Sequence, residues 1–125
     1  MSLFADLTEI PELSIVPDGE YDLRVVSAKQ IEAKTSGRKA IMLVCDIIGE
    51  DNAENVFHKL WLPMESDSEE KALIMNRIIK EFLLAVYLPV DGSVELEDFN
   101  DLDFTAILGT DTYEGLESNV VKRII

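Results

Sequence analysis

The chain has 125 residues, 47% of them hydrophobic, so it is long enough for one domain with a substantial core and too short for two ordinary ones. Its formal net charge of −14 disfavours binding to a polyanion anywhere except at a locally basic site. The single cysteine, Cys45, excludes an intrachain disulfide; it lies in an apolar run typical of a core position and indicates a reducing, cytoplasmic compartment.

The negative charge is unevenly distributed along the chain. Residues 21–62 hold six acids and six bases, whereas the segments before and after this neutral block carry the whole acidic excess. A polyanion is therefore expected to approach the neutral block. The longest apolar run, residues 82–90, is about half of a membrane span, and no leader pattern opens the chain, so we expect neither membrane insertion nor export.

The elements expected in the first half are β-strands. Residues 1–16 mix apolar pairs with acids and form an arm that packs loosely or docks on a neighbour, and residues 17–125 form one domain. Alternation predicts a strand over residues 21–33, and the apolar run 40–48 a second, buried strand. The turn "KTSGRK" joins the two into a long hairpin.

A third strand, one long helix and two further strands follow. The segment "VFHKLWL" predicts the third strand, stopped by Pro63. Residues 65–88 show helical spacing, with Ser66 and Glu69 at capping-box distance and Pro89 as the expected end. Residues 91–103 are acidic, with at most a short turn of helix. "FTAILGT" predicts a fourth strand, and the last 13 residues a fifth strand or a short hairpin through Glu114-Gly115.

This order predicts a mainly β fold with one long helix between strands three and four. It fits a five-stranded Greek-key barrel, partly open, of the oligonucleotide-binding (OB) type. A split α+β sandwich has the same order of elements, and the sequence does not separate the two.

We expect no catalysis, because no motif supplies a catalytic or cofactor site. His58 has no second His or Cys for a zinc shell, and its expected role is that of a packed or surface imidazole. The chain shows no nucleophile elbow, phosphate loop, dinucleotide fingerprint or calcium loop. The abundant carboxylates are typical of a solvated acidic surface, and no metal or cofactor is expected.

The third strand carries a pattern suited to nucleic acid. Alternation places Phe57, Lys59 and Trp61 on one face and Val56, His58, Leu60 and Leu62 on the other. If the second set fills the core, the first presents two aromatic rings with a cation between them, which suits stacked bases and phosphates. Burial of Trp61 and Phe57 in the core is the competing interpretation, as is a merely solubilising role for the hairpin bases.

Several segments together resemble phage-encoded single-stranded-DNA-binding proteins of replication and recombination modules. The resemblance rests on "GEY", "TSGRKAIMLVCDI", "VFHKLWL", "NRIIKEFLLAV" and the closing "YEG" and "NVVKRI", over residues 17–125. It implies an OB-type barrel that coats single strands in the cytoplasm of the host cell and recruits replication or recombination proteins through acidic segments. It matches Gly19 and Tyr21 to the start of the first strand, Ser36 and Gly37 to the hairpin turn, and Asn119, Lys122 and Arg123 to the last strand.

From the residues and the resemblance together, we predict a sequence-tolerant single-stranded DNA-binding protein. The sequence does not determine its oligomeric state, and a homo-oligomer is compatible with it. The expected nucleic-acid-binding residues are Arg24, Lys29, Lys34, Arg38, Lys39, Phe57, Lys59, Trp61, Lys122 and Arg123.

Three departures support an alternative. "AVYLP" replaces the glycine expected near the helix end, Asp103 stands where a base is expected, and the chain ends in "VVKRII" rather than in an acidic tail. The alternative is an acidic protein-interaction module, such as a phage assembly or accessory factor, that binds basic partners through its acid-rich segments without binding nucleic acid.

Overall fold

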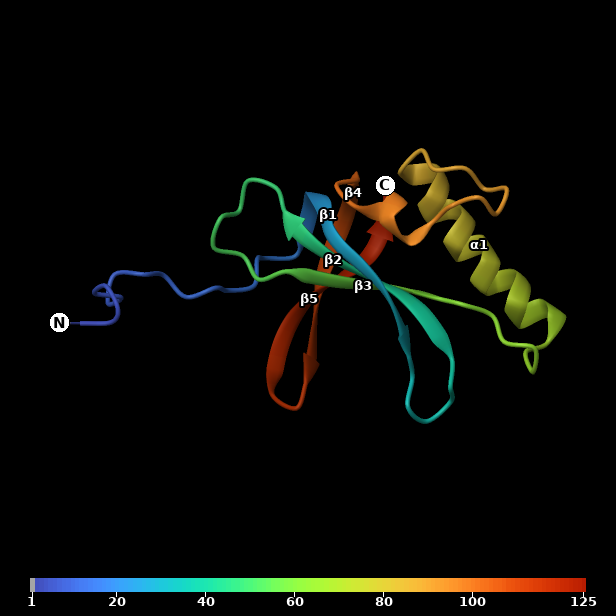
Figure 1. Cartoon of the computed structure of the whole chain (residues 1–125), viewed down its shortest axis with the longest axis horizontal. Coiled ribbons are helices and arrows are strands. Elements are labelled where there is room, and N and C mark those ends of the chain that lie inside the picture. Colours follow the sequence, from blue (N-terminus) through green and yellow to red (C-terminus); the bar gives the residue numbers. More distant parts are fainter. Residues whose placement is uncertain (1) are drawn as a thin grey trace.

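The computed structural model describes residues 2–125 and shows a mainly β protein with one long helix (Figure 1). The elements in chain order are β1 (Gly19–Glu32), β2 (Lys39–Ile47), β3 (Val56–Trp61), α1 (Glu69–Ala85), the 3₁₀ helix η1 (Leu96–Phe99), β4 (Asp103–Tyr113) and β5 (Leu116–Ile124). The predicted order of strands and helix is confirmed, including a fifth strand joined to β4 through Glu114 and Gly115, both of which have positive φ.

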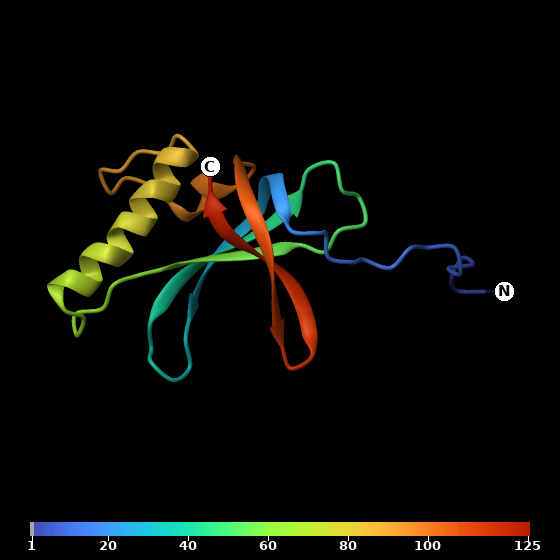
Figure 2. The same ribbon diagram turned by 180° about the vertical axis from the view of Figure 1, so that it is seen from behind.

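The five strands form one antiparallel sheet in the order β3-β2-β1-β4-β5. The edge strands β3 and β5 lie close to each other. Within the described residues no hydrogen-bonded ladder joins them, so the sheet is open. Long hairpins, β1–β2 and β4–β5, extend to the same side of the molecule in both views (Figures 1 and 2).

The start of α1 differs from the sequence expectation. Ser68, rather than Ser66, is the N-cap: it has an extended backbone, and its hydroxyl accepts a hydrogen bond from the Lys71 amide at 3.1 Å. Ser66 lies instead in the preceding turn, which the hydrogen bond from the Asp67 amide to the Met64 carbonyl closes. The capping-box prediction was wrong because this turn occupies the residues that the predicted first turn of the helix required.

The end of α1 also comes earlier than Pro89. The Leu88 amide bonds to the Leu83 carbonyl and the Tyr87 amide to the Leu84 carbonyl, which is the Schellman arrangement. Tyr87 takes the left-handed position of this motif, with φ of 61°. The helix therefore ends at Ala85 without help from the proline.

The core lies between the sheet and the C-terminal half of α1. The strands contribute alternate side chains, among them Leu23, Leu43, Val56 and Leu60, all at most 2% exposed. Phe82 is the buried residue of α1, and its ring meets that of Phe104 edge-on, with the centroids 5.2 Å apart.

Cys45 belongs to this core, as expected, and His58 is a half-buried side chain packed beside it. Cys45 is fully buried, and the burial, followed by the charge of Asp46, raises the pKa of its thiol to about 12. The His58 ring lies 5.8 Å from that of Phe82, and its burial lowers the pKa of the imidazole. Both shifts favour the uncharged form of the side chain.

The N-terminal arm is exposed over residues 2–14 and attached at its base. Ser14 exchanges backbone hydrogen bonds with the β2–β3 loop, accepting from the Glu54 amide and donating to the Asn52 carbonyl. Val16 is buried, and the Asn119 side chain both accepts from its amide and donates to its carbonyl at 2.9 Å. Within residues 2–125, no helix is long and apolar enough to cross a membrane.

Candidate nucleic-acid interface

The outer face of β3 exposes two aromatic side chains with a lysine between them. Phe57 is 54% exposed and Trp61 36%, whereas Val56 and Leu60 on the other face are buried. The Lys59 ammonium lies 5.6 Å from the centroid of the Trp61 ring, within cation–π range. The predicted division of β3 into a core face and an outer face is confirmed, and neither aromatic ring is enclosed in the core.

The sheet register carries this face across to β1. Lys59 is opposite Met42 of β2, and Met42 is opposite Lys29 of β1. Because side chains opposite one another in antiparallel strands point to the same side of the sheet, Lys29 shares the outer face with Lys59. Phe57, Lys59 and Trp61 of β3 together with Lys29 of β1 form what we call the outer face below.

The tip of the β1–β2 hairpin, whose Ala33 and Ser36 line a hollow together with Lys59 and Trp61, carries a further base. Gly37 has φ of 72° and its amide donates to the Ala33 carbonyl, while the Ser36 hydroxyl accepts from the Arg38 amide. These bonds confirm the predicted Ser36-Gly37 turn and leave Lys34 exposed at the tip. Lys34 therefore extends the cationic surface beyond the end of the sheet.

Arg38 has a structural role that the sequence did not indicate. Its guanidinium bonds to both carboxylate oxygens of Asp67, at 2.7 and 2.8 Å, and donates to the Leu62 carbonyl. The side chains are only 15% and 4% exposed, and this hydrogen bonding raises the pKa of Arg38 and holds that of Asp67 well below its usual range. The pair fastens the hairpin to the segment before α1, and its charges largely cancel.

The remaining predicted bases lie apart from the outer face or are paired. Arg24 binds Asp103 at 2.7 Å, so the acid that stands where a base is expected has a partner of its own. The Lys122 side chain lies against Gly109, so that a Cβ atom added to Gly109 would come within 2.5 Å of it. The Lys122 ammonium forms an ion pair with Asp111. Lys39 is on the opposite side of the sheet, beside a hollow lined by Leu62 and Pro63. Arg123 borders another hollow, beside the C-terminal half of α1.

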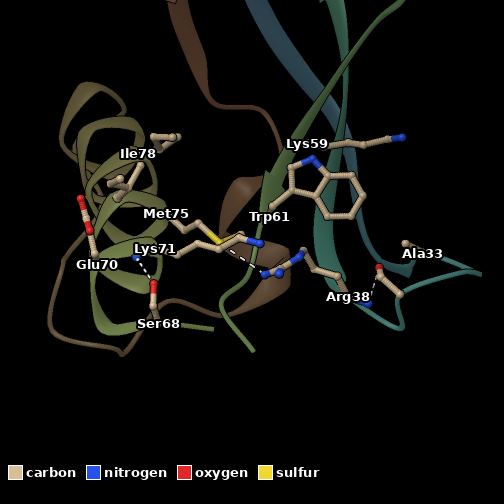
Figure 3. A pocket seen from close by; sticks show the side chains of 11 residues that line it. Ala33, Arg38, Lys59, Trp61, Ser68, Glu70, Lys71, Met75 and Ile78 are labelled. Atoms are coloured by element: carbon tan, nitrogen blue, oxygen red, sulfur yellow. Dashed lines mark hydrogen bonds between the residues drawn. The ribbon is translucent and has the colours of Figure 1, made fainter. Parts of the chain in front are cut away.

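A groove of about 720 Å³ separates the outer face from the N-terminal half of α1. Figure 3 shows Trp61 and Lys59 on one side of it, and Met75, Ile78 and Lys71 of α1 on the other. Sequence reasoning missed this groove although its signal was visible. Ile74, Ile78 and Phe82 follow one another at i, i+4 spacing, and only the last is buried, since α1 extends past the sheet edge.

The groove is mixed in charge, with a local excess of bases. Lys59, Lys71 and Arg38 line it, together with the single acid Glu70. Asp67 lies behind Arg38 and is also 3.7 Å from the Lys71 ammonium. The groove and the outer face are therefore less acidic than the chain as a whole, whose net charge is −14.

No protein-family model matches this chain, and no curated protein is significantly similar to it. Within residues 2–125, no three His, Cys, Asp or Glu side chains gather as metal ligands would. The resemblance to phage single-stranded-DNA-binding proteins stays a prediction, and function has to be inferred from the geometry of the outer face.

Proposed function

We propose that the outer face binds single-stranded DNA with little regard to sequence. The observation that carries this proposal is the exposed row Phe57, Lys59 and Trp61 on an edge strand. Aromatic rings open to water offer stacking surfaces that every base can use, and stacking contributes about 1–3 kcal/mol per base. Lys59 lies between the two rings, where a phosphate between two stacked bases needs a counter-charge.

Base stacking and charge together favour a single strand over a duplex as the ligand. Bases in a duplex are already stacked on each other, so Phe57 and Trp61 have nothing to stack on there. Without stacking, binding would depend on phosphate contacts alone, and the few lysines of the outer face would have to overcome a net charge of −14. A single strand gains from both the rings and the lysines.

We further propose that the open sheet is a variant of the OB-type barrel. The strand order, the approach of β3 to β5 and the helix between β3 and β4 all agree with that fold. In OB folds the ligand lies on the face of strands two and three and between the loops that follow strands one and four. The outer face and the two hairpins that project together correspond to these places (Figure 1). A phage replication or recombination module in the host cytoplasm is the setting that the resemblance implies.

The experiment uses Trp61, the only tryptophan, as the reporter. Titration with a 20-nucleotide oligothymidylate at low salt is expected to quench its fluorescence, because a base stacks on the indole. Phe57→Ala should weaken binding by about tenfold or more. Lys39→Gln, on the opposite side of the sheet, is the matched control for Lys59→Gln. An unchanged Trp61 signal at low salt, or equal effects of the two lysine variants, contradicts the proposal.

One observation favours the acidic interaction module as a second candidate. Three of the predicted bases, Arg24, Arg38 and Lys122, are already paired with carboxylates. By contrast Glu97 and Asp101 are exposed on the segment between α1 and β4. If this candidate holds, Glu97→Gln with Asp101→Asn weakens binding to a lysine-rich peptide, while oligothymidylate has no effect on Trp61.

A further inference from the structure

The N-terminal arm exposes more apolar surface than a free segment of a monomer usually does. Leu3 is 92% exposed and Phe4 77%, and Leu7, Ile10 and Leu13 are all more than half exposed. Exposed apolar residues that gather in one short segment mark a contact site rather than ordinary surface. Leu3, Leu7 and Ile10 have the i, i+4, i+7 spacing by which a short helix presents anchors to a groove.

The arm is also purely acidic. It carries Asp6, Glu9 and Glu12 and, over residues 2–14, no lysine or arginine. Asp6 already forms a local turn by accepting from the Thr8 amide and hydroxyl, and the Ile10 amide donates to the Leu7 carbonyl. The partner of such a segment should be an apolar groove with basic edges.

The groove between α1 and the outer face has these properties. Ile74 and Ile78 of α1 are each about half exposed, and Trp61 faces them from the other wall. Lys59 and Lys71 line the same groove and can meet the carboxylates of the arm. The groove thus matches the arm both in apolar character and in sign of charge.

The arm belongs to a different part of the molecule from the groove. Its base is fixed to the β2–β3 loop by Ser14 and to β5 by Val16. From there the arm extends away from the domain, at the end opposite α1, in both views (Figures 1 and 2). In this position the arm lies away from its own groove and leaves that groove open to the arm of a second molecule.

We propose that the arm of one copy docks in the α1–β3 groove of a second copy. Leu3, Phe4 and Leu7 then cover Ile74, Ile78 and Trp61, and the arm acids lie near Lys59 and Lys71. Because the arm and the groove are different surfaces, two copies can exchange arms in a closed dimer, or successive copies can add head to tail. Trp61 and Lys59 belong to both sites, so a docked arm and a DNA strand compete for them. The proposal concerns protein association and does not require that the outer face binds DNA.

The mass of the full chain in solution tests association. Light scattering after gel filtration should give a mass above the 14.0 kDa of one chain, rising with concentration. The full-length double variant Leu3→Asp with Phe4→Asp should stay monomeric, while keeping the circular dichroism of the parent, because neither residue belongs to the core. A mass of 14.0 kDa for the parent at millimolar concentration overturns the proposal.

A peptide of residues 2–13 tests where the arm docks. Added to the double variant, it should change Trp61 fluorescence, and Ile74→Glu should weaken its binding by at least about tenfold. Leu84→Glu is the matched control, since Leu84 is on the same helix and equally exposed but outside this groove. Equal effects of the two variants overturn the assignment. So does a parent chain that stays monomeric at every concentration while its own arm covers Trp61. These measurements contain no nucleic acid, so their failure leaves the oligonucleotide titration unaffected.

Discussion

The salt dependence of oligonucleotide binding is the sharpest consequence of the ion pairs. Of the bases predicted from the sequence, Lys29 and Lys59 lie on the outer face and Lys34 is exposed at the hairpin tip, and the three take part in none of the described ion pairs. Each phosphate contact on a single strand contributes about −0.7 to the slope of log K against log salt. Three contacts therefore give a slope of about −2, and raising salt from 50 to 200 mM should weaken binding by about twentyfold.

The assay is the Trp61 titration repeated at five or more salt concentrations. Lys59→Gln should make the slope less negative by about 0.7, because one contact is lost. Lys39→Gln should leave it unchanged, because that side chain is on the other side of the sheet. Both variants lose one positive charge, so a difference between their slopes reports the position of the lysine rather than the net charge of the protein.

The opposite result is equally clear. If all eight predicted bases contacted phosphate, the slope would be about −6 rather than −2. A slope of that size would mean that Arg24, Arg38 and Lys122 leave their carboxylates on binding, and the assignment of Arg38 to a structural pair would be wrong. A slope that responds equally to Lys59→Gln and Lys39→Gln would show that only net charge matters.

Three further predictions concern the fold that holds the outer face. Phe82→Ala should lower the free energy of unfolding by about 3–5 kcal/mol in urea denaturation, because it empties the contact between α1 and the sheet; a loss below 1 kcal/mol would contradict this. Tyr87→Gly should raise that free energy by about 1 kcal/mol, since a non-glycine residue with φ of 61° is strained; Tyr87→Ala, which keeps the strain, is its control. Because burial lowers the pKa of His58, the unfolded chain binds a proton below the ordinary value of 6.5 that the folded chain does not. Stability should therefore fall as the pH drops from 7.5 to 5.5, and His58→Leu should remove that part of the dependence in thermal melts.

The strands and the helix could be predicted because their signals are local. Alternation along β3 separated Val56 and Leu60 from Phe57 and Trp61, and the two faces differ in the structure as that pattern requires. The Ser36-Gly37 turn was recognisable from its residues for the same reason. The cap of α1 was misplaced because Ser66 and Ser68 are equivalent locally, and the choice between them depends on the turn that Asp67 helps to close.

The candidate site was less predictable because it depends on contacts between distant residues. Arg38 and Asp67 are 29 positions apart, and nothing in the composition of the hairpin distinguishes Arg38 from Lys34. Arginine forms two parallel bonds to one carboxylate, whereas lysine binds as a single point charge, so a nearly buried carboxylate such as Asp67 selects the arginine. The basic cluster of the hairpin thus divides by residue type: the arginine holds the hairpin against α1, and the lysines remain in water. Arg38→Lys should accordingly loosen the groove wall although the net charge is kept, which separates the structural part of the cluster from the part available to a ligand.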